Sequence, residues 1–179
     1  MPDSSNLGLI HIYCGNGKGK TTCGMGLCVR AAGFGFRVLI YQFMKNNSTS
    51  ERAAMAHIEN ITFLPGLEQE KFSFRMSEEE KEEHRRFYAA QLQHIAEMVK
   101  DGAFDVLFLD EAVYCVRNGL LEEAALLDFL KNKPEHLEVI LTGQDPSPAL
   151  IECADYVSEI RKVKHPFDKG VRARKGIER

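Results

Sequence analysis

Glycine and lysine alternate in one short stretch of the chain, Gly15-Asn16-Gly17-Lys18-Gly19-Lys20-Thr21-Thr22. Because glycine has no Cβ, successive backbone N–H groups of such a stretch can turn toward an anion. An ammonium on Lys20 can reach phosphate oxygens, and the hydroxyl of Thr21 can ligate Mg²⁺ beside them. The residue types therefore predict a site for a polyphosphate.

A strand before this stretch and a helix after it would hold the stretch in place. Residues 9–14 form a mainly apolar run typical of a buried strand, and residues 22–32 carry apolar side chains at helical spacing. A strand, a Gly-rich loop and a helix N-terminus together make a P-loop, in which the helix dipole adds partial positive charge. The usual motif has a glycine where this chain has Cys14, and Gly15 and Gly17 lie inside the loop instead. We therefore expect a cradle of somewhat different shape.

Two adjacent acids, Asp110 and Glu111, end a third apolar run that begins at Phe104. This pattern resembles a Walker B motif, in which one acid orients the shell of Mg²⁺ and the second joins it or polarises a water molecule. A solvated acid at a strand end is the simpler alternative. The sequence does not decide between Asp110 and Glu111 as the direct metal ligand.

The remaining pattern alternates between the two kinds of element. Strands are predicted at residues 9–14, 37–43, 61–63, 104–111, 137–142 and 156–160, and helices at 22–32, 51–58, 77–101, 120–131 and 148–154. This order predicts an α/β fold, a P-loop NTPase-like (RecA-like) three-layer arrangement with a mostly parallel central sheet. Ligands should bind at the carboxyl ends of its strands.

Two of the predicted helices carry specific signals. Ser77 and Glu80 have the spacing of a capping box at the start of the long helix. Its buried stripe is predicted to be Tyr88, Leu92, Ile95 and Val99. In the helix at residues 120–131, the inward side chains are predicted to be Leu120, Ala124, Leu127 and Leu130.

Length and charge narrow the class of protein. The 179 residues fit a single domain, 1–179, whose residues 161–179 form a basic tail. That tail carries eight Lys/Arg and two Asp/Glu, a charge of +6, which leaves −9 for the rest of the chain. The tail either contacts an anion or is a solvated terminus, and the acidic remainder does not favour nucleic acid as a partner.

Other compositional features point to a cytoplasmic protein. No apolar run is long enough to span a bilayer, and residues 1–6 do not resemble a signal peptide. The five cysteines are odd in number and form no C-x-x-C pair, so we expect neither a disulfide framework nor a zinc site.

Several motifs together resemble one family, the P-loop ATP:corrinoid (cob(I)alamin) adenosyltransferases. The resemblance covers nearly the whole chain. Its most distinctive part lies at the end, in residues 154–159, Val163-Lys164-His165-Pro166-Phe167 and 170–178; the other matching segments are 15–22, 30–33, 38–43, 109–111 and 141–143. The family implies transfer of the 5′-deoxyadenosyl group of ATP to the Co(I) centre of a corrinoid, with release of triphosphate.

The resemblance also implies roles for individual residues. The triphosphate would lie against residues 15–22, namely Gly15, Asn16, Gly17, Lys18, Gly19, Lys20, Thr21 and Thr22. Lys20 and Glu111 would be the catalytic residues, Thr21 and Glu111, with Asp110 as a further candidate, would hold Mg²⁺, and Arg30 would lie near the nucleoside. Phe72 and Phe74 occupy the region where family members place aromatic residues on the lower face of the corrinoid, although both could equally be core residues. A homodimer and a flavodoxin-type reductant that supplies Co(I) are the implied partners.

Two other functions fit part of the sequence. An ordinary P-loop ATPase or kinase would use the same residues for phosphoryl chemistry, with Asp110 and Glu111 serving the metal and a water molecule. A corrinoid carrier without catalysis would keep the nucleotide site as a sensor. The tail motif favours the adenosyltransferase over both.

Overall fold

The computed structural model describes residues 6–68 and 76–178. Its elements run in the order β1 (Ile10–Cys14), α1 (Lys20–Phe34), β2 (Val38–Gln42), α2 (Ser50–Met55), β3 (Ile61–Phe63), α3 (Glu78–Lys100), β4 (Val106–Asp110), α4 (Ala112–Arg117), α5 (Glu123–Asn132), β5 (Glu138–Thr142), α6 (Pro148–Cys153) and β6 (Tyr156–Glu159). The strands form one sheet in the order β3-β2-β4-β5-β1-β6, and every neighbouring pair is parallel. The predicted α/β fold with a parallel central sheet is confirmed.

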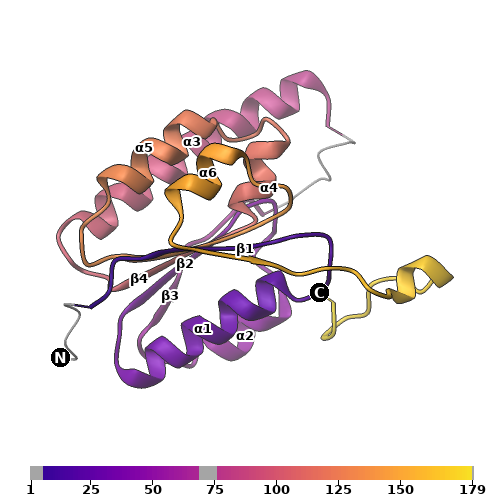
Figure 1. The fold of residues 1–179 in the computed structure, drawn as a ribbon, viewed down its shortest axis with the longest axis horizontal. Helices are drawn as coiled ribbons and strands as arrows, with labels where there is room; N and C mark the ends of the chain where they lie inside the picture. Colours follow the sequence, from indigo (N-terminus) through magenta and orange to yellow (C-terminus); the bar gives the residue numbers. More distant parts are fainter. Residues whose placement is uncertain (1–5, 69–75, 179) are drawn as a thin grey trace.

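Helices cover both faces of the sheet, which gives three layers (Figure 1). Helices α1 and α2 pack on one face, over a core that includes Val38, Ile40 and Phe108. Helices α3, α4, α5 and α6 lie on the other face, over a larger core that includes Tyr41 and Leu109. Because successive residues of a strand point to opposite faces, each central strand supplies both cores, and its residues are buried throughout.

Helix α1 approaches the middle of the sheet closely at Gly24. A Cβ at this position would lie 2.3 Å from Cζ of Phe108 on β4, far inside van der Waals contact. Glycine is therefore required here by the space between the helix and the sheet. This contact fixes the distance between the helix that follows the Gly-rich loop and the strand that ends in Asp110.

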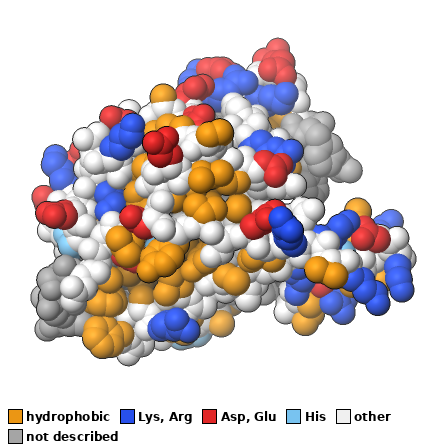
Figure 2. Space-filling model, viewed as in Figure 1, with side chains coloured by type: hydrophobic (Ala, Val, Ile, Leu, Met, Phe, Trp, Pro, Cys, Tyr) orange, Lys and Arg blue, Asp and Glu red, His pale blue; other side chains and the backbone are white. Residues whose placement is uncertain are grey.

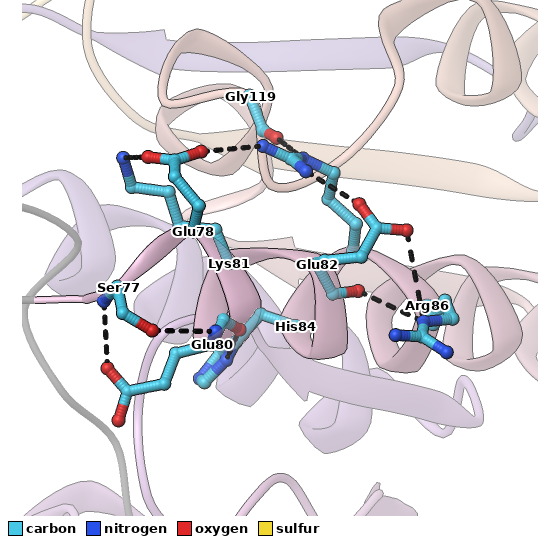
Figure 3. A network of polar contacts seen from close by, with 9 residues as sticks. Ser77, Glu78, Glu80, Lys81, Glu82, His84, Arg86 and Gly119 are labelled. Atoms are coloured by element: carbon cyan, nitrogen blue, oxygen red, sulfur yellow. Dashed lines mark hydrogen bonds and ion pairs between the residues drawn. The ribbon is translucent and has the colours of Figure 1, made fainter.

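The long helix α3 begins with the predicted capping box (Figure 3). Ser77 Oγ accepts a hydrogen bond from the N–H of Glu80 at 3.2 Å, and the Glu80 side chain accepts one from the N–H of Ser77 at 2.9 Å. One turn later, Arg85 Nε donates to the carbonyl oxygen of Gly119 at 2.7 Å. The helix start is thus tied to the turn between α4 and α5, and the predicted stripe of Tyr88, Leu92, Ile95 and Val99 is buried.

Two details of the helical layer differ from the prediction. Helix α5 begins at Glu123, after Leu120, and Ala124 is exposed rather than inward. Leu120 and Leu130 are buried as predicted, Leu127 packs against the core, and Leu126 and Phe129 are buried as well. Helix α4 was not predicted. Its six residues follow the two acids that end the run of β4, and so short a segment has no periodicity that separates a helix from a strand.

The chain after β6 first leaves the body of the molecule and then returns to it (Figure 1). It contains a short 3₁₀ helix, Pro166–Lys169, in which His165 Nδ1 accepts a hydrogen bond from the N–H of Phe167 at 3.1 Å. The C-terminal end lies beside the loop between β1 and α1. None of the helices in the described residues combines the length and the apolar character that crossing a bilayer would require.

Candidate active site

The Gly-rich stretch forms the connection between β1 and α1, as predicted. Helix α1 begins at Lys20, slightly earlier than the predicted Thr22, and Gly19 precedes it with a φ of 117°. A Cβ added to Gly19 would meet nothing within 4 Å, so this side of the loop is open. The first N–H groups of α1 have no side-chain cap and face this open side, which suits an anion.

Gly15 and Gly17 answer to a different requirement. Cβ atoms at these positions would lie 2.5 Å and 2.8 Å from the carbonyl oxygen of Ile160, the residue after β6. The N–H of Gly17 donates to that same oxygen at 2.7 Å, and Asn16 Oδ1 accepts from the N–H of Lys162 at 2.8 Å. The unusual glycine spacing therefore reflects the close contact between the loop and residues 160–162.

Lys20 and Thr21 point to different partners. Lys20 Nζ donates to the carbonyl oxygen of Gly17 at 2.9 Å, so the ammonium lies over the loop. Thr21 Oγ1 donates to Asp110 Oδ1 at 2.9 Å, across the gap between α1 and the end of β4. A cavity of about 130 Å³ is lined by residues 17–22 together with Glu111, Ile177 and Glu178.

Asp110 is fully buried at the centre of a polar cluster. Its Oδ1 also accepts from Thr142 Oγ1 at 2.6 Å, and its Oδ2 accepts from Gln42 Nε2 at 3.1 Å and from Lys45 Nζ at 2.6 Å. Gln42, Asp110 and Thr142 end β2, β4 and β5, which are neighbours in the sheet. The parallel register therefore brings these three strand ends to one place.

Glu111 leaves the line of β4 because its backbone is left-handed, with a φ of 61°. Its N–H donates to Thr142 Oγ1 at 2.7 Å, and its side chain lines the same cavity as Lys20. Burial raises the pKa of Glu111, and the negative charge of Asp110 adds to this effect, while Lys45 and Lys20 oppose it. A non-glycine residue in this conformation at a cavity is typical of functional sites.

Lys45 lies between the loop and the acid. Its Nζ is 3.0 Å from Thr21 Oγ1 and 2.6 Å from Asp110 Oδ2. Burial alone would lower the pKa of Lys45, but the charges of Asp110, Glu111 and Glu51 outweigh burial and raise it. The side chain is therefore a charged ammonium held by a hydroxyl and a carboxylate.

The residues around Lys45 fit a magnesium ion. Thr21, Asp110 and Glu111 offer the hydroxyl and carboxylate oxygens that Mg²⁺ prefers, and a positive group already lies between two of them. Within residues 6–68 and 76–178, no three His, Cys, Asp or Glu side chains form a complete metal site. An ion here would thus depend on phosphate and water oxygens for the rest of its shell.

The C-terminal tail forms the wall opposite the loop. A cavity of about 540 Å³ lies between Thr21, Thr22, Lys45 and Glu51 on one side and residues 176–178 on the other. A second, of about 340 Å³, lies between residues 16–18 with Lys20 and tail residues that include His165 and Arg172. The Arg174 side chain, hydrogen-bonded to Glu178, lowers the pKa of that carboxyl to about 2, and Lys18 contributes.

The other predicted site residues lie farther away or outside the described residues. Arg30 is exposed on α1, ten residues after Lys20 and therefore about 15 Å along the helix. Phe72 and Phe74 lie outside the described residues. The sequence analysis predicted no role for Gln42, Lys45, Glu51 or Thr142. Gln42 and Thr142 could have been found, because each is a polar residue at the end of a buried strand beside a P-loop.

Comparison with known proteins agrees with this geometry. Residues 6–179 match the model of the family described as ATP:corrinoid adenosyltransferase BtuR/CobO/CobP. A corrinoid adenosyltransferase of Escherichia coli strain K12 is 33% identical over 171 residues, covering 96% of this chain and 85% of the relative, and one of Salmonella typhimurium gives the same values. A corrinoid adenosyltransferase of Pseudomonas aeruginosa is 31% identical over 173 residues, covering 96% and 83%.

Among solved structures, a KaiC-like protein of Pyrococcus horikoshii superimposes with a TM-score of 0.57 at 18% identity, covering 89% of this chain and 75% of that one. This likeness concerns the fold alone. The family match extends over the loop, the strand ends and the tail. The chain belongs to the ATP:corrinoid adenosyltransferase family.

Proposed function

We propose that this protein transfers the 5′-deoxyadenosyl group of ATP to the Co(I) centre of a corrinoid and releases triphosphate. The observation that carries the proposal is the family match over residues 6–179. The site agrees with it, because Lys20 and Glu111 line one cavity together with the Gly-rich loop. The cavities along the loop continue one another through Thr21, Thr22 and residues 177–178. A chain of such cavities has room for an extended nucleotide.

The chemistry asks for stabilisation of a leaving group. An electron pair of Co(I) forms a bond to C5′ of the ribose, and the bond from C5′ to the triphosphate oxygen breaks. Negative charge then builds up on the triphosphate, and the loop N–H groups, the α1 N-terminus and Lys20 are placed to stabilise that charge. No side chain has to act as a nucleophile.

Mg²⁺ would be held by Thr21 and by one or both of Asp110 and Glu111. When bound, the ion neutralises part of the charge of the triphosphate. Asp110 is already shared among four hydrogen bonds, whereas Glu111 lines the cavity. This difference supports Glu111 as the acid that faces the metal and its water molecules, with Asp110 fixing Thr21.

The remaining assignments extend this proposal. Arg30 would act near the nucleoside of ATP, and Phe72 and Phe74 on the corrinoid. We assign the supply of Co(I) to an external flavodoxin-type reductant, in a cytoplasmic setting.

The edge of the sheet at β6 supports a homodimer: β6 has β1 as its neighbour on one side, and Tyr156 and Val157 are 52% and 42% exposed. In Figure 2, hydrophobic side chains gather across the face turned to the viewer.

An anaerobic assay tests the proposed reaction. Chemically reduced cob(I)alamin, ATP and Mg²⁺ are mixed with the protein, the visible spectrum is followed, and the released phosphates are identified. We expect a light-sensitive Co–C product together with intact triphosphate. Release of ADP and phosphate without such a product would contradict the proposal.

A P-loop ATPase or kinase is the second candidate, because Asp110 and Glu111 could serve a metal ion and a water molecule in that chemistry as well. ADP formation in the absence of corrinoid would favour it. Tight corrinoid binding without ATP consumption would instead indicate a carrier.

A further inference from the structure

Lys45 lies in the site, although no sequence motif predicted a role for it there. It follows β2 after Met44, whose backbone is left-handed with a φ of 53°. This turn directs the chain back toward the loop, and the side chain of Lys45 is only 23% exposed. A long cationic side chain is normally solvated, so its burial here needs a reason.

The reason lies in its two partners. The ammonium contacts Thr21 Oγ1 at 3.0 Å and Asp110 Oδ2 at 2.6 Å. These are an alcohol oxygen and a carboxylate oxygen from the loop and from β4, the two elements whose meeting point suits a magnesium ion. Lys45 therefore provides a positive charge at the place where a bound Mg²⁺ would provide one.

Asp110 needs such a charge when no metal is bound. Its carboxylate is fully buried, and of its four hydrogen-bond partners Gln42, Thr21 and Thr142 are neutral, whereas Lys45 carries charge. A buried carboxylate without a counter-charge is strongly disfavoured. Lys45 thus keeps the strand ends and Thr21 in place before a nucleotide arrives.

We propose that Lys45 supplies the positive charge at Thr21 and Asp110 before Mg²⁺ binds and gives way to Mg²⁺ when the metal and ATP bind. This inference rests on the proposed function, because it takes the metal site as given. Thr21 Oγ1, which Lys45 contacts, is also an expected metal ligand, and an ammonium and a divalent cation repel each other too strongly to share this oxygen. The ammonium must therefore leave Thr21 as the metal enters, and the apparent affinity for Mg²⁺ is reduced by this competition.

The test compares Lys45→Met with wild type by calorimetric titration of ATP at stepped MgCl₂ concentrations, without corrinoid. Lys133→Met is the matched control, since Lys133 is also partly buried but donates to the carbonyl oxygen of Gly8. We expect Lys45→Met to need roughly tenfold less Mg²⁺ for half-maximal ATP binding, because the competing cation is gone. We also expect its metal-free form to melt at a lower temperature and to recover the difference with Mg²⁺ and ATP. Lys133→Met should keep the wild-type Mg²⁺ requirement.

Other results would overturn the proposal in distinguishable ways. An unchanged Mg²⁺ requirement in Lys45→Met, with wild type clearly dependent on Mg²⁺, would exclude Lys45 as a competitor while leaving the metal site intact. Weaker ATP binding at saturating Mg²⁺ would make Lys45 a phosphate ligand instead. ATP binding by wild type that is independent of Mg²⁺ would remove the metal site itself and this inference with it. Lys45→Gln, which keeps a hydrogen-bond donor, repeats the titration if the methionine variant does not fold.

Discussion

Lys20 combines a mobile ammonium with a position at the first residue of α1. In the structure its Nζ rests on the carbonyl oxygen of Gly17, so the charge is already held over the loop before a phosphate arrives. Among the site residues, Lys20 is the one whose substitution we expect to affect ATP binding and turnover most.

Lys20→Ala should lower the rate of adenosyl transfer by about 100-fold or more, since it removes a charged donor to the leaving triphosphate. ATP binding should weaken in parallel, whereas the urea unfolding midpoint should stay close to wild type. Initial rates and calorimetric ATP titration measure the two effects. Lys100→Ala, an exposed position paired with Glu97 at the end of α3, serves as control. Retained turnover in Lys20→Ala would contradict the assigned cradle.

Glu111 gives a prediction about pH. Because burial and Asp110 raise its pKa in the folded protein, ionising Glu111 costs stability, and that cost grows as the pH rises from the pKa of the unfolded chain through that of the folded protein. Glu111→Gln removes the cost. We expect the ligand-free variant to be more stable than wild type toward urea at pH 7.5, and this advantage to vanish below about pH 4. A constant difference between the two proteins at both pH values would show that ionisation of Glu111 is not its source.

At the scale of the elements, the site depends on how closely α1 lies to β4. Gly24 and Gly26 lie on the same helix but meet different surroundings. A Cβ at Gly24 would collide with Phe108, while one at Gly26 would meet nothing within 4 Å. Alanine substitutions at these two positions therefore separate the effect of helix packing on stability from the effect of helix propensity.

Gly24→Ala should destabilise the protein by about 1–3 kcal/mol, because the added methyl group overpacks the contact between α1 and β4. It should also weaken ATP binding, since Thr21 and Asp110 would be moved apart. Gly26→Ala should instead be neutral or gain up to about 1 kcal/mol. Urea unfolding of both variants measures the contrast, and equal effects at the two positions would refute the packing argument.

The sequence predicted those parts of the fold and site that depend on local pattern. The Gly-rich loop, the strand ending in Asp110 and the capping box of α3 follow from residue types at short spacing, and the structure confirms each element. Residues 112–117 carry no distinguishing period, so α4 was missed. Around α5, Leu120 and Leu130 are buried as predicted, whereas Ala124 is exposed.

The contacts of Asp110 could not be predicted in the same way. The acid contacts Gln42, Lys45 and Thr142 only because β2, β4 and β5 are neighbours in register. The order of strands in a sheet cannot be inferred from any single segment of the sequence. Lys45 in particular lies between the strand predicted at residues 37–43 and the helix predicted at 51–58, outside every predicted element. The roles of Arg30, Phe72 and Phe74 stay predictions.

At the scale of the whole molecule, the edge of the sheet at β6 is the place where we expect a second copy to bind. Val157 on β6 is 42% exposed, and Val29 on α1 is 43% exposed, so the two positions form a matched pair. If a second copy covers the β6 edge, Val157→Lys should shift the protein from dimer to monomer, because a buried interface does not accept an unpaired charge. Val29→Lys should leave the mass unchanged. Sedimentation equilibrium measures both, and a dimer that persists in Val157→Lys would exclude this edge as the interface.

The hydrogen bond from Gly17 to Ile160 has a consequence for synthesis of the chain. The loop leaves the ribosome well before Ile160 and Lys162, which shape it. The strands on both sides of β1, namely β5 and β6, also come late. A nascent chain therefore carries the nucleotide loop without these contacts until residues 156–162 have been synthesised. The final shape of the loop arises only after that point of translation.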